Sequence, residues 1–154
     1  MKVQDVMTSK VRSCGPETNL AEAVKMMWEN DCGILPVVDS QSKILSAITD
    51  RDIAIAVGTR SRLAADIPVV DVMPDLVVTA APDEDLRSAL RTMKTALVRR
   101  LPVTDRDGVL RGILSINDIV LWAANNPTAP SAEDVVSTLK AICQHHRTRV
   151  AAAR

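Results

Sequence analysis

One segment of the sequence occurs twice, and this internal repeat constrains the fold more than any other feature. Residues 3–57 reappear as residues 69–123, shifted by 66 positions without an insertion or a deletion. The tripeptide Leu-Pro-Val at 35–37, for example, returns at 101–103. Two copies of so long a period are too few for a solenoid. The repeat therefore predicts two copies of one small unit, packed face to face with pseudo-two-fold symmetry, so that any cleft between them occurs twice.

Each copy is predicted to be a β-α-β-β-α unit, which places the chain in the mixed α/β (α+β) class. The first two strands are expected to be parallel across the helix, and the last two antiparallel. A unit of roughly 60 residues buries too little surface to be stable alone, so we expect the copies to share one core. The expected strands and helices lie at residues 11–14, 20–30, 34–38, 44–48 and 50–57, and again at 76–80, 86–96, 101–104, 109–114 and 116–124.

These patterns divide the chain into five segments. The repeats span 1–58 and 68–124, the linker spans 59–67, a C-terminal helix spans 131–146, and a flexible basic tail spans 147–154. The apolar residues of the C-terminal helix, among them Val135 and Leu139, share one face. That face is open to two interpretations: a reader or dimer contact, or additional core packing.

Composition argues against nucleic-acid and membrane partners. Lys plus Arg and Asp plus Glu number 19 each, and the only aromatic residues are Trp28 and Trp122. A neutral chain has no general attraction for polyanions, and few rings are available for base stacking. No apolar run approaches the roughly 20 residues of a membrane span. The three cysteines show no paired spacing and indicate reduced thiols, hence a cytoplasmic protein.

The last strand and last helix of each copy meet at a hydroxyl residue followed three positions later by aspartate. These pairs are Thr49 with Asp52, and Ser115 with Asp118. The unpaired N–H groups and the dipole of a helix start attract phosphate, and a nearby carboxylate can accept hydrogen bonds from a ribose. The same spacing is typical of a capping box. The motif alone leaves both interpretations open.

Two cations, Arg99 and Arg100, stand at the start of a predicted strand of the second copy. Guanidinium groups bind phosphate through charge-assisted, often bidentate hydrogen bonds. If the copies pack by their strands, these arginines can face a phosphate at the helix start of the other copy. The alternative is that they pair with surface carboxylates such as Asp105 or Asp107.

Taken together, these segments resemble a tandem pair of CBS (cystathionine β-synthase) domains, often called a Bateman module. The resemblance covers about Lys2 to Ala124. It rests on the Asp-Val-Met openings, the Leu-Pro-Val strands, and the segments Ile-Thr-Asp-Arg-Asp-Ile and Ile-Leu-Ser-Ile-Asn-Asp-Ile. It implies a non-enzymatic regulatory module that senses AMP, ADP, ATP, NAD or S-adenosylmethionine, signals to a partner, and forms a homodimer through the helices of its repeats. At least one tryptophan is expected at that interface.

The resemblance also implies which residues bind the ligand. The hydroxyl and aspartate of each motif would contact phosphate and ribose, and aliphatic side chains and first-strand backbone would hold adenine. Family packing implies that Thr49 and Asp52 face Arg99 and Arg100, while Ser115 and Asp118 face Gly33 and Ile34. We therefore expect cations at the first cleft and none comparable at the second. The remaining expected ligand-binding residues are Arg51 and Asn117 within the motifs, and Val11, Ser13, Val77, Thr79 and Ile113 around the adenine.

One departure from the family pattern is Ser46, where the second copy has Gly112 and the family often has glycine. No set of residues indicates catalysis or a metal. Adjacent His145 and His146 lack further ligands, and glycine-rich nucleotide motifs are absent from the sequence. The alternative to a sensor is a protein-interaction or oligomerisation scaffold whose clefts are vestigial and bind no ligand.

Overall fold

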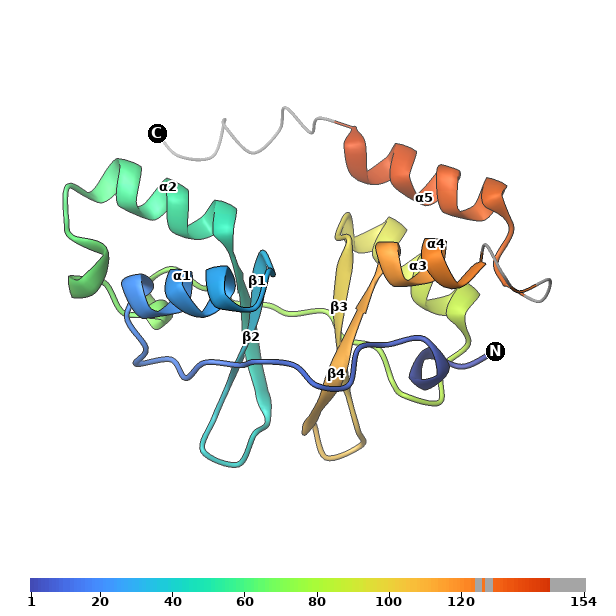
Figure 1. Ribbon diagram of the computed structural model, residues 1–154, viewed down its shortest axis with the longest axis horizontal. Coiled ribbons are helices and arrows are strands. Elements are labelled where there is room, and N and C mark those ends of the chain that lie inside the picture. Colours follow the sequence, from blue (N-terminus) through green and yellow to red (C-terminus); the bar gives the residue numbers. More distant parts are fainter. Residues whose placement is uncertain (124–125, 127–128, 145–154) are drawn as a thin grey trace.

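The computed structural model of the chain describes residues 1–123, 126 and 129–144. Two similar halves lie side by side, with one further helix beyond the second half (Figure 1). This confirms the predicted mixed α and β fold. In chain order the elements are the short 3₁₀ helix η1 (Val3–Asp5), α1 (Leu20–Glu29), β1 (Ile34–Val38), β2 (Ile44–Thr49), α2 (Asp50–Arg60), η2 (Ala64–Asp66), η3 (Val69–Asp71), α3 (Leu86–Ala96), β3 (Arg100–Thr104), β4 (Leu110–Ser115), α4 (Ile116–Ala123) and α5 (Ala132–Cys143).

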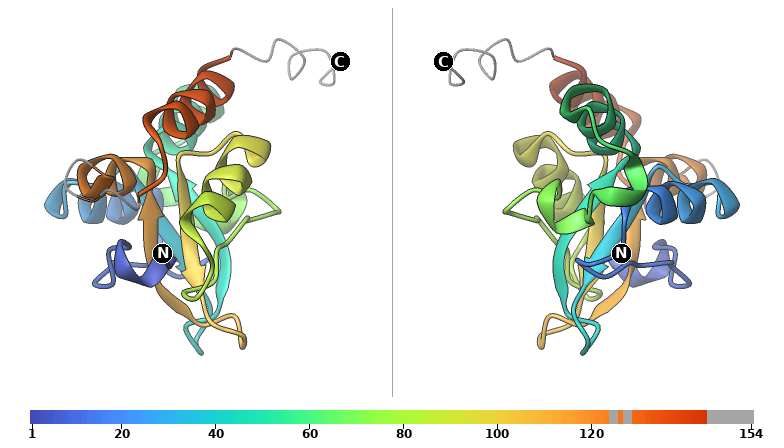
Figure 2. Two further views of the ribbon diagram at one scale, coloured as in Figure 1. Left: turned by 90° about the vertical axis from the view of Figure 1, so that its right-hand side faces the viewer. Right: turned by 90° about the vertical axis from the view of Figure 1, so that its left-hand side faces the viewer.

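Each half is built on one antiparallel hairpin. In the first, β1 pairs with β2 and sets Leu35 opposite Ile48. In the second, β3 pairs with β4 and sets Leu101 opposite Leu114. All four side chains are fully buried, and the helices pack on both faces of the hairpins: Figure 2 shows α1 and α4 on one side and α3 on the other.

The predicted leading strands are much shorter than expected. Each is reduced to one parallel bridge residue, Cys14 beside Val37 and Ala80 beside Val103. Cys14 donates its N–H to the carbonyl of Pro36 at 3.0 Å, and its carbonyl accepts the N–H of Val38 at 2.9 Å. The pairing ends there because a proline follows each bridge two residues later and cannot donate to a strand ladder.

The helix starts follow the capping residues in the sequence. Asn19 accepts the N–H of Glu22 at 2.9 Å and starts α1. Asp85 accepts the N–H of Arg87 at 2.9 Å and starts α3. A side chain that satisfies an otherwise unpaired N–H contributes about 1 kcal/mol to helix stability, which is why both helices begin at the equivalent leucine.

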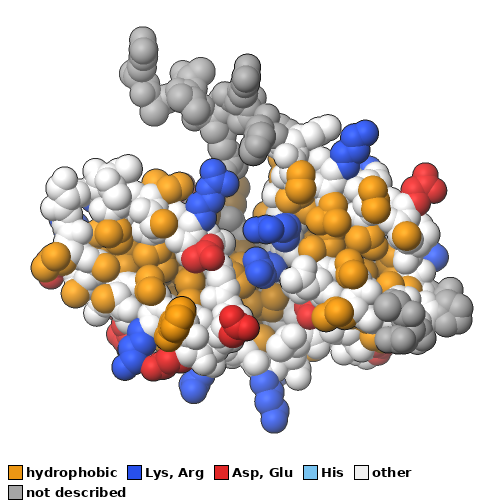
Figure 3. Space-filling view, turned by 45° about the horizontal axis from the view of Figure 1, so that its top comes forward, with side chains coloured by type: hydrophobic (Ala, Val, Ile, Leu, Met, Phe, Trp, Pro, Cys, Tyr) orange, Lys and Arg blue, Asp and Glu red, His pale blue; other side chains and the backbone are white. Residues whose placement is uncertain are grey.

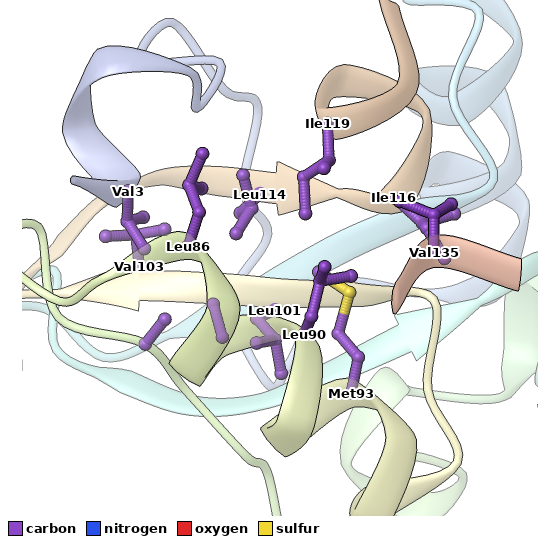
Figure 4. Packing of buried hydrophobic residues seen from close by; sticks show 12 residues of the cluster. Val3, Leu86, Leu90, Met93, Leu101, Val103, Leu114, Ile116, Ile119 and Val135 are labelled. Atoms are coloured by element: carbon purple, nitrogen blue, oxygen red, sulfur yellow. The ribbon is translucent and has the colours of Figure 1, made fainter. Parts of the chain in front are cut away.

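The halves have two hydrophobic cores, not the single shared core that the sequence predicted. Each core is nevertheless completed by the other copy. Val3, from the first copy, is buried in the core of the second half with Leu86 and Val103 (Figure 4). Val69, from the second copy, is buried with Leu20 in the first half. The start of each repeat therefore belongs structurally to the opposite half, and the N-terminus lies beside the second half in Figure 1.

Backbone hydrogen bonds fix this exchange. Val3 donates its N–H to the carbonyl of Glu84 at 2.9 Å, and Val69 donates to the carbonyl of Thr18 at 2.8 Å. The two hairpin turns also bind each other, because Ile44 donates to the carbonyl of Gly108 at 3.0 Å. Exchanged starts and paired turns together hold the halves in the predicted pseudo-two-fold arrangement.

Helix α5 packs on the second half, mainly against α3. Val135 is 7% exposed and lies in the same cluster as Leu90 and Ile116 (Figure 4). At the surface Lys94 Nζ donates to Ser137 Oγ at 2.8 Å. His145, His146 and the predicted tail lie outside the described residues.

Candidate functional site

Both hydroxyl–aspartate motifs form complete capping boxes. Thr49 Oγ1 donates to Asp52 Oδ2 at 2.6 Å, and the N–H of Asp52 donates back to Thr49 Oγ1 at 3.2 Å. Ser115 and Asp118 repeat this geometry at 2.7 and 3.1 Å. The capping interpretation is therefore confirmed for both copies. It does not conflict with ligand binding, because two of these four side chains also line a cavity.

A cavity of about 330 Å³ lies between the two halves. The second copy contributes the box residues Ser115 and Asp118 together with strand residues of its hairpin. The first copy contributes the segment that crosses from η1 toward α1, and the loop between α1 and β1. The lining residues are Thr8, Lys10, Val11, Arg12, Asn30, Asp31, Cys32, Ile34, Arg100, Ile113, Ser115 and Asp118.

The crossing segment reaches the cavity because it lies directly on β4. Thr8 and Ile113 exchange both backbone hydrogen bonds, each 2.9 Å long. Such close approach requires glycine at the neighbouring position: a Cβ on Gly112 would lie only 2.5 Å from the Thr8 carbonyl oxygen. With Thr8 held in this way, the next few residues extend over the cavity and bring Lys10 and Arg12 to its wall.

The first copy makes the equivalent contact differently. Ser46 is fully buried, and its Oγ donates to the carbonyl of Pro74 at 2.6 Å. Pro74 corresponds to Thr8 but has no N–H, so the two-way backbone pairing of the second copy cannot form. The departure from glycine at Ser46 thus replaces a backbone bond with a side-chain bond.

The cavity combines three kinds of chemistry. Val11, Ile34 and Ile113 provide an apolar wall, Ser115 and Asp118 provide a hydroxyl and a carboxylate, and Lys10, Arg12 and Arg100 are cations. Pockets of this size with apolar walls and a few convergent polar groups are typical binding sites for small molecules. The arrangement suits a flat apolar ring, a diol and an anionic group on one ligand.

The predicted distribution of cations between the clefts was wrong. Arg100 lines the cavity of Ser115 and Asp118 rather than facing Thr49 and Asp52. The reason is strand register: Arg100 pairs directly with Ser115 across the β3–β4 ladder, and directly paired residues project from the same face of a sheet. The alternative prediction paired these arginines with surface carboxylates such as Asp105. It was also wrong for Asp105, because that carboxylate contacts Arg111 Nη2 at 2.6 Å.

Sequence reasoning missed Lys10 and Arg12. Their only indication was Val11, which was expected beside adenine and which they flank on the crossing segment. Arg51, Arg99 and Asn117 are exposed. Thr79 lines a different cavity, of about 480 Å³, beside Asp105 and Asp107 at the edge of the second half. Ser13 and Val77 are half-buried in the crossing segments of their copies.

Two units of this kind, with exchanged starts and a ligand-sized cavity between them, define a tandem-repeat module. The sequence profile of the CBS domain matches residues 3–58 and 67–125. The chain therefore belongs to the CBS domain family and is a CBS pair, as the sequence motifs indicated.

Similar proteins agree with this assignment. The CBS domain-containing protein YhcV of Bacillus subtilis (strain 168) is 32% identical over 130 residues, which cover 84% of this chain and 91% of that protein. The structure of CBSX2 in complex with AMP has a TM-score of 0.70 and 28% identity, and covers 80% of this chain and 96% of that one. The CBS domain pair of protein MJ0100, in complex with 5′-methylthioadenosine and S-adenosyl-L-methionine, shares the fold with a TM-score of 0.73 at 24% identity, covering 82% of this chain and 98% of that one.

Within residues 1–123, 126 and 129–144, no helix is both long and apolar enough to cross a membrane. The same described residues contain no group of three or more His, Cys, Asp or Glu side chains arranged to hold a metal ion.

Proposed function

We propose that this chain is a non-enzymatic, cytoplasmic regulatory module that binds an adenosine-containing ligand of the AMP, ADP or ATP type and signals to a partner protein. The observation that carries the proposal is the cavity at Ser115 and Asp118, where apolar, hydroxyl, carboxylate and cationic groups meet. Its support from relatives is that CBSX2 was solved with AMP and the MJ0100 pair with two other adenosine compounds.

Each chemical group of such a ligand has a counterpart in the cavity. Val11, Ile34 and Ile113 would hold the adenine ring, and Asp118 would accept hydrogen bonds from the ribose hydroxyls. In the described residues the hydrogen bonds to Asp118 all use Oδ2, which leaves Oδ1 for the ribose. The lining holds three cations against the carboxylates of Asp31 and Asp118. This excess of positive charge favours a phosphate over the positively charged sulfonium of S-adenosylmethionine, because like charges repel at short range.

Isothermal titration calorimetry with AMP, ADP, ATP, NAD and S-adenosylmethionine tests the proposal. We expect the phosphorylated adenosines to bind most tightly. Arg100→Ala should weaken AMP binding roughly 10- to 100-fold, since a hydrogen bond to a charged group contributes about 1.5–3 kcal/mol. Arg106→Ala, which removes a cation from the edge of the second half, is the matched control and should leave the affinity unchanged. The fitted stoichiometry shows whether the position at Thr49 and Asp52, where Arg51 and Arg99 were expected to bind phosphate, binds a ligand as well.

Cys32 offers an independent test, because its thiol lines the cavity while Cys143 is exposed on α5. Bound AMP should slow alkylation of Cys32 by iodoacetamide and leave the rate at Cys143 unchanged, as read by mass spectrometry of the same sample. Equal rates with and without saturating AMP would place the ligand elsewhere.

Exposed apolar side chains support the homodimer. Figure 3 shows hydrophobic side chains gathered over both halves on the face of α1 and α4, with cationic side chains between them. Trp28 on α1 is 86% exposed and Leu121 on α4 is 73% exposed, whereas Trp122 packs against the second core. Large exposed apolar patches mark interaction surfaces. We expect Trp28→Glu to shift the chain toward monomer in sedimentation experiments.

The same patch would suit the ligand-free scaffold, and thermal denaturation separates the two functions. A ligand that binds only the folded state raises its melting temperature. No shift with any of the five compounds at millimolar concentration would favour the scaffold.

A further inference from the structure

Helix α5 lies over the strand–helix junction that carries the candidate site. Ile116 stands between the two cavity-lining residues Ser115 and Asp118, but its own side chain is buried in the second core, against Val135 of α5 (Figure 4). Its N–H donates to the carbonyl of Arg99 at 3.0 Å, next to the cavity residue Arg100. One turn of chain therefore contacts the cavity on one side and α5 on the other.

One face of α5 holds it on the second half, mainly against α3. Val135 and Thr138 are buried there, and Leu139 and Ile142 pack partly buried against the same core. The polar links at its surface are Lys94 with Ser137, and Arg87 with Asp134 at 4.0 Å. Exposed pairs of this kind contribute little stability. The free energy of local opening varies from one element of a fold to another. Because α5 is attached through this one apolar face, its attachment depends on the surface beneath it.

The first copy has no equivalent apolar surface on which a helix could pack as α5 does. Where the second copy has Ile116, the first has Asp50, an exposed residue whose Oδ2 lies 2.8 Å from where a Cβ on Gly33 would be. Where the second has Leu90, which is 2% exposed, the first has Val24, which is 45% exposed. The apolar surface that binds α5 is thus specific to the copy whose capping box lines the cavity.

We infer that docking of α5 is coupled to occupancy of the cleft at Ser115 and Asp118. Helix α5 is then the element that transmits ligand binding in that cleft to a partner protein. The inference rests on the proposed function for the identity of the ligand. A ligand bound to Ser115 and Asp118 holds the first turn of α4 in place, and with it the Ile116 surface on which Val135 sits. Docked α5 is then favoured over undocked α5. Linkage requires the converse: loosening α5 weakens ligand binding.

Hydrogen exchange of the full chain, read by mass spectrometry, tests the coupling with AMP as the probe. Saturating AMP should slow exchange in residues 131–144 about fivefold or more, the lower range of typical coupling. Val135→Ala shifts α5 toward the undocked form and should weaken AMP binding, by at most that same factor. Val136→Ala, a change at the 62% exposed neighbour on the same helix, should do neither. Unchanged α5 exchange with bound AMP would overturn the inference.

A ligand-free comparison keeps the inference testable if AMP and its analogues do not bind, an outcome that would refute the proposed function alone. Asp118→Asn loosens the box beneath α5, and Asp52→Asn loosens the equivalent box of the first copy. Exchange in α5 should accelerate in the first variant and not in the second. Equal acceleration in both, or none in either, would contradict the coupling.

Discussion

Gly112 and Ser46 occupy the same position in the two copies, and each is adapted to the chain that crosses it. Gly112 leaves room for the carbonyl of Thr8, and Ser46 binds the carbonyl of Pro74. The need for glycine is therefore steric, not conformational. The close approach at Gly112 also accounts for the position of the cavity, because the crossing segment held there brings Lys10 and Arg12 to the cavity wall.

Gly112→Ala should destabilise the protein by about 1–3 kcal/mol, the usual cost of overpacking, because its Cβ would meet backbone rather than a mobile side chain. Gly58 is the control: it lies inside α2, and a Cβ there would meet nothing within 4 Å. Gly58→Ala should stabilise by roughly 0.5–1 kcal/mol through helix propensity. Urea denaturation measures both changes. Shifts of the same sign would contradict this steric argument.

Cys14 should be the least reactive of the three thiols. Burial raises the pKa of its thiol to about 11, partly offset by a backbone hydrogen bond. At pH 8 iodoacetamide should modify Cys143 first and Cys14 only after unfolding. The native thiol keeps its proton above the unfolded pKa of 9.0, so its contribution to stability should fall as the pH rises from about 9 toward 11. Rapid labelling of native Cys14 would contradict its burial.

At the scale of elements, the described part of the chain contains the same helix start three times. Ser131 and Asp134 at α5 form a capping box with an Oγ–Oδ2 distance of 2.9 Å, like those at Thr49 and Ser115. The α5 box is exposed, whereas that of Ser115 and Asp118 lines the cavity. A local motif therefore specifies where a helix begins but not whether the helix start meets a ligand, which depends on the segments packed around it.

The start of α5 should loosen in acid. Hydrogen bonds from the Ser131 hydroxyl, and then from its backbone N–H, lower the pKa of the Asp134 carboxyl below its ordinary value of 3.8. A lowered pKa stabilises the fold above pH 3.8, and this contribution is lost as the pH falls through the folded-state pKa. NMR shifts of the amides at the start of α5 should report this titration. The control Asp134→Asn should abolish it, and a dependence that survives in that variant would point to another group.

At the scale of the whole molecule, the dominant feature is the exchange of N-terminal segments between halves. Hairpins and helices followed from local patterns, and strand β1 begins and ends where the sequence predicted. The exchange could not be predicted in this way, because two equivalent copies offer Val3 two equivalent cores and the repeat does not choose between them. The prediction of where Arg100 lies failed because its position depends on the register of β3 and β4, which the repeat does not specify either.

Val3→Ala tests the exchange. Although Val3 belongs to the first copy, it is fully buried in the second core, so its truncation should cost about 1–3 kcal/mol. Hydrogen exchange should accelerate more in α3 than in α1. Val70→Ala changes a valine that is 43% exposed and serves as the control. Greater loss of protection in α1 would contradict the exchanged arrangement.

The exchanged starts have a consequence for how such a protein assembles. One repeat made as a separate chain would lack the N-terminal segment that completes its hydrophobic core. It could obtain that segment only by exchanging N-terminal segments with a second molecule. Its folding would then depend on protein concentration. Joining both repeats in one polypeptide makes this trade intramolecular, with an effective concentration that a short connection can raise to the millimolar range. Each chain therefore contains both N-terminal segments that its two cores need, so its folding does not depend on dilution.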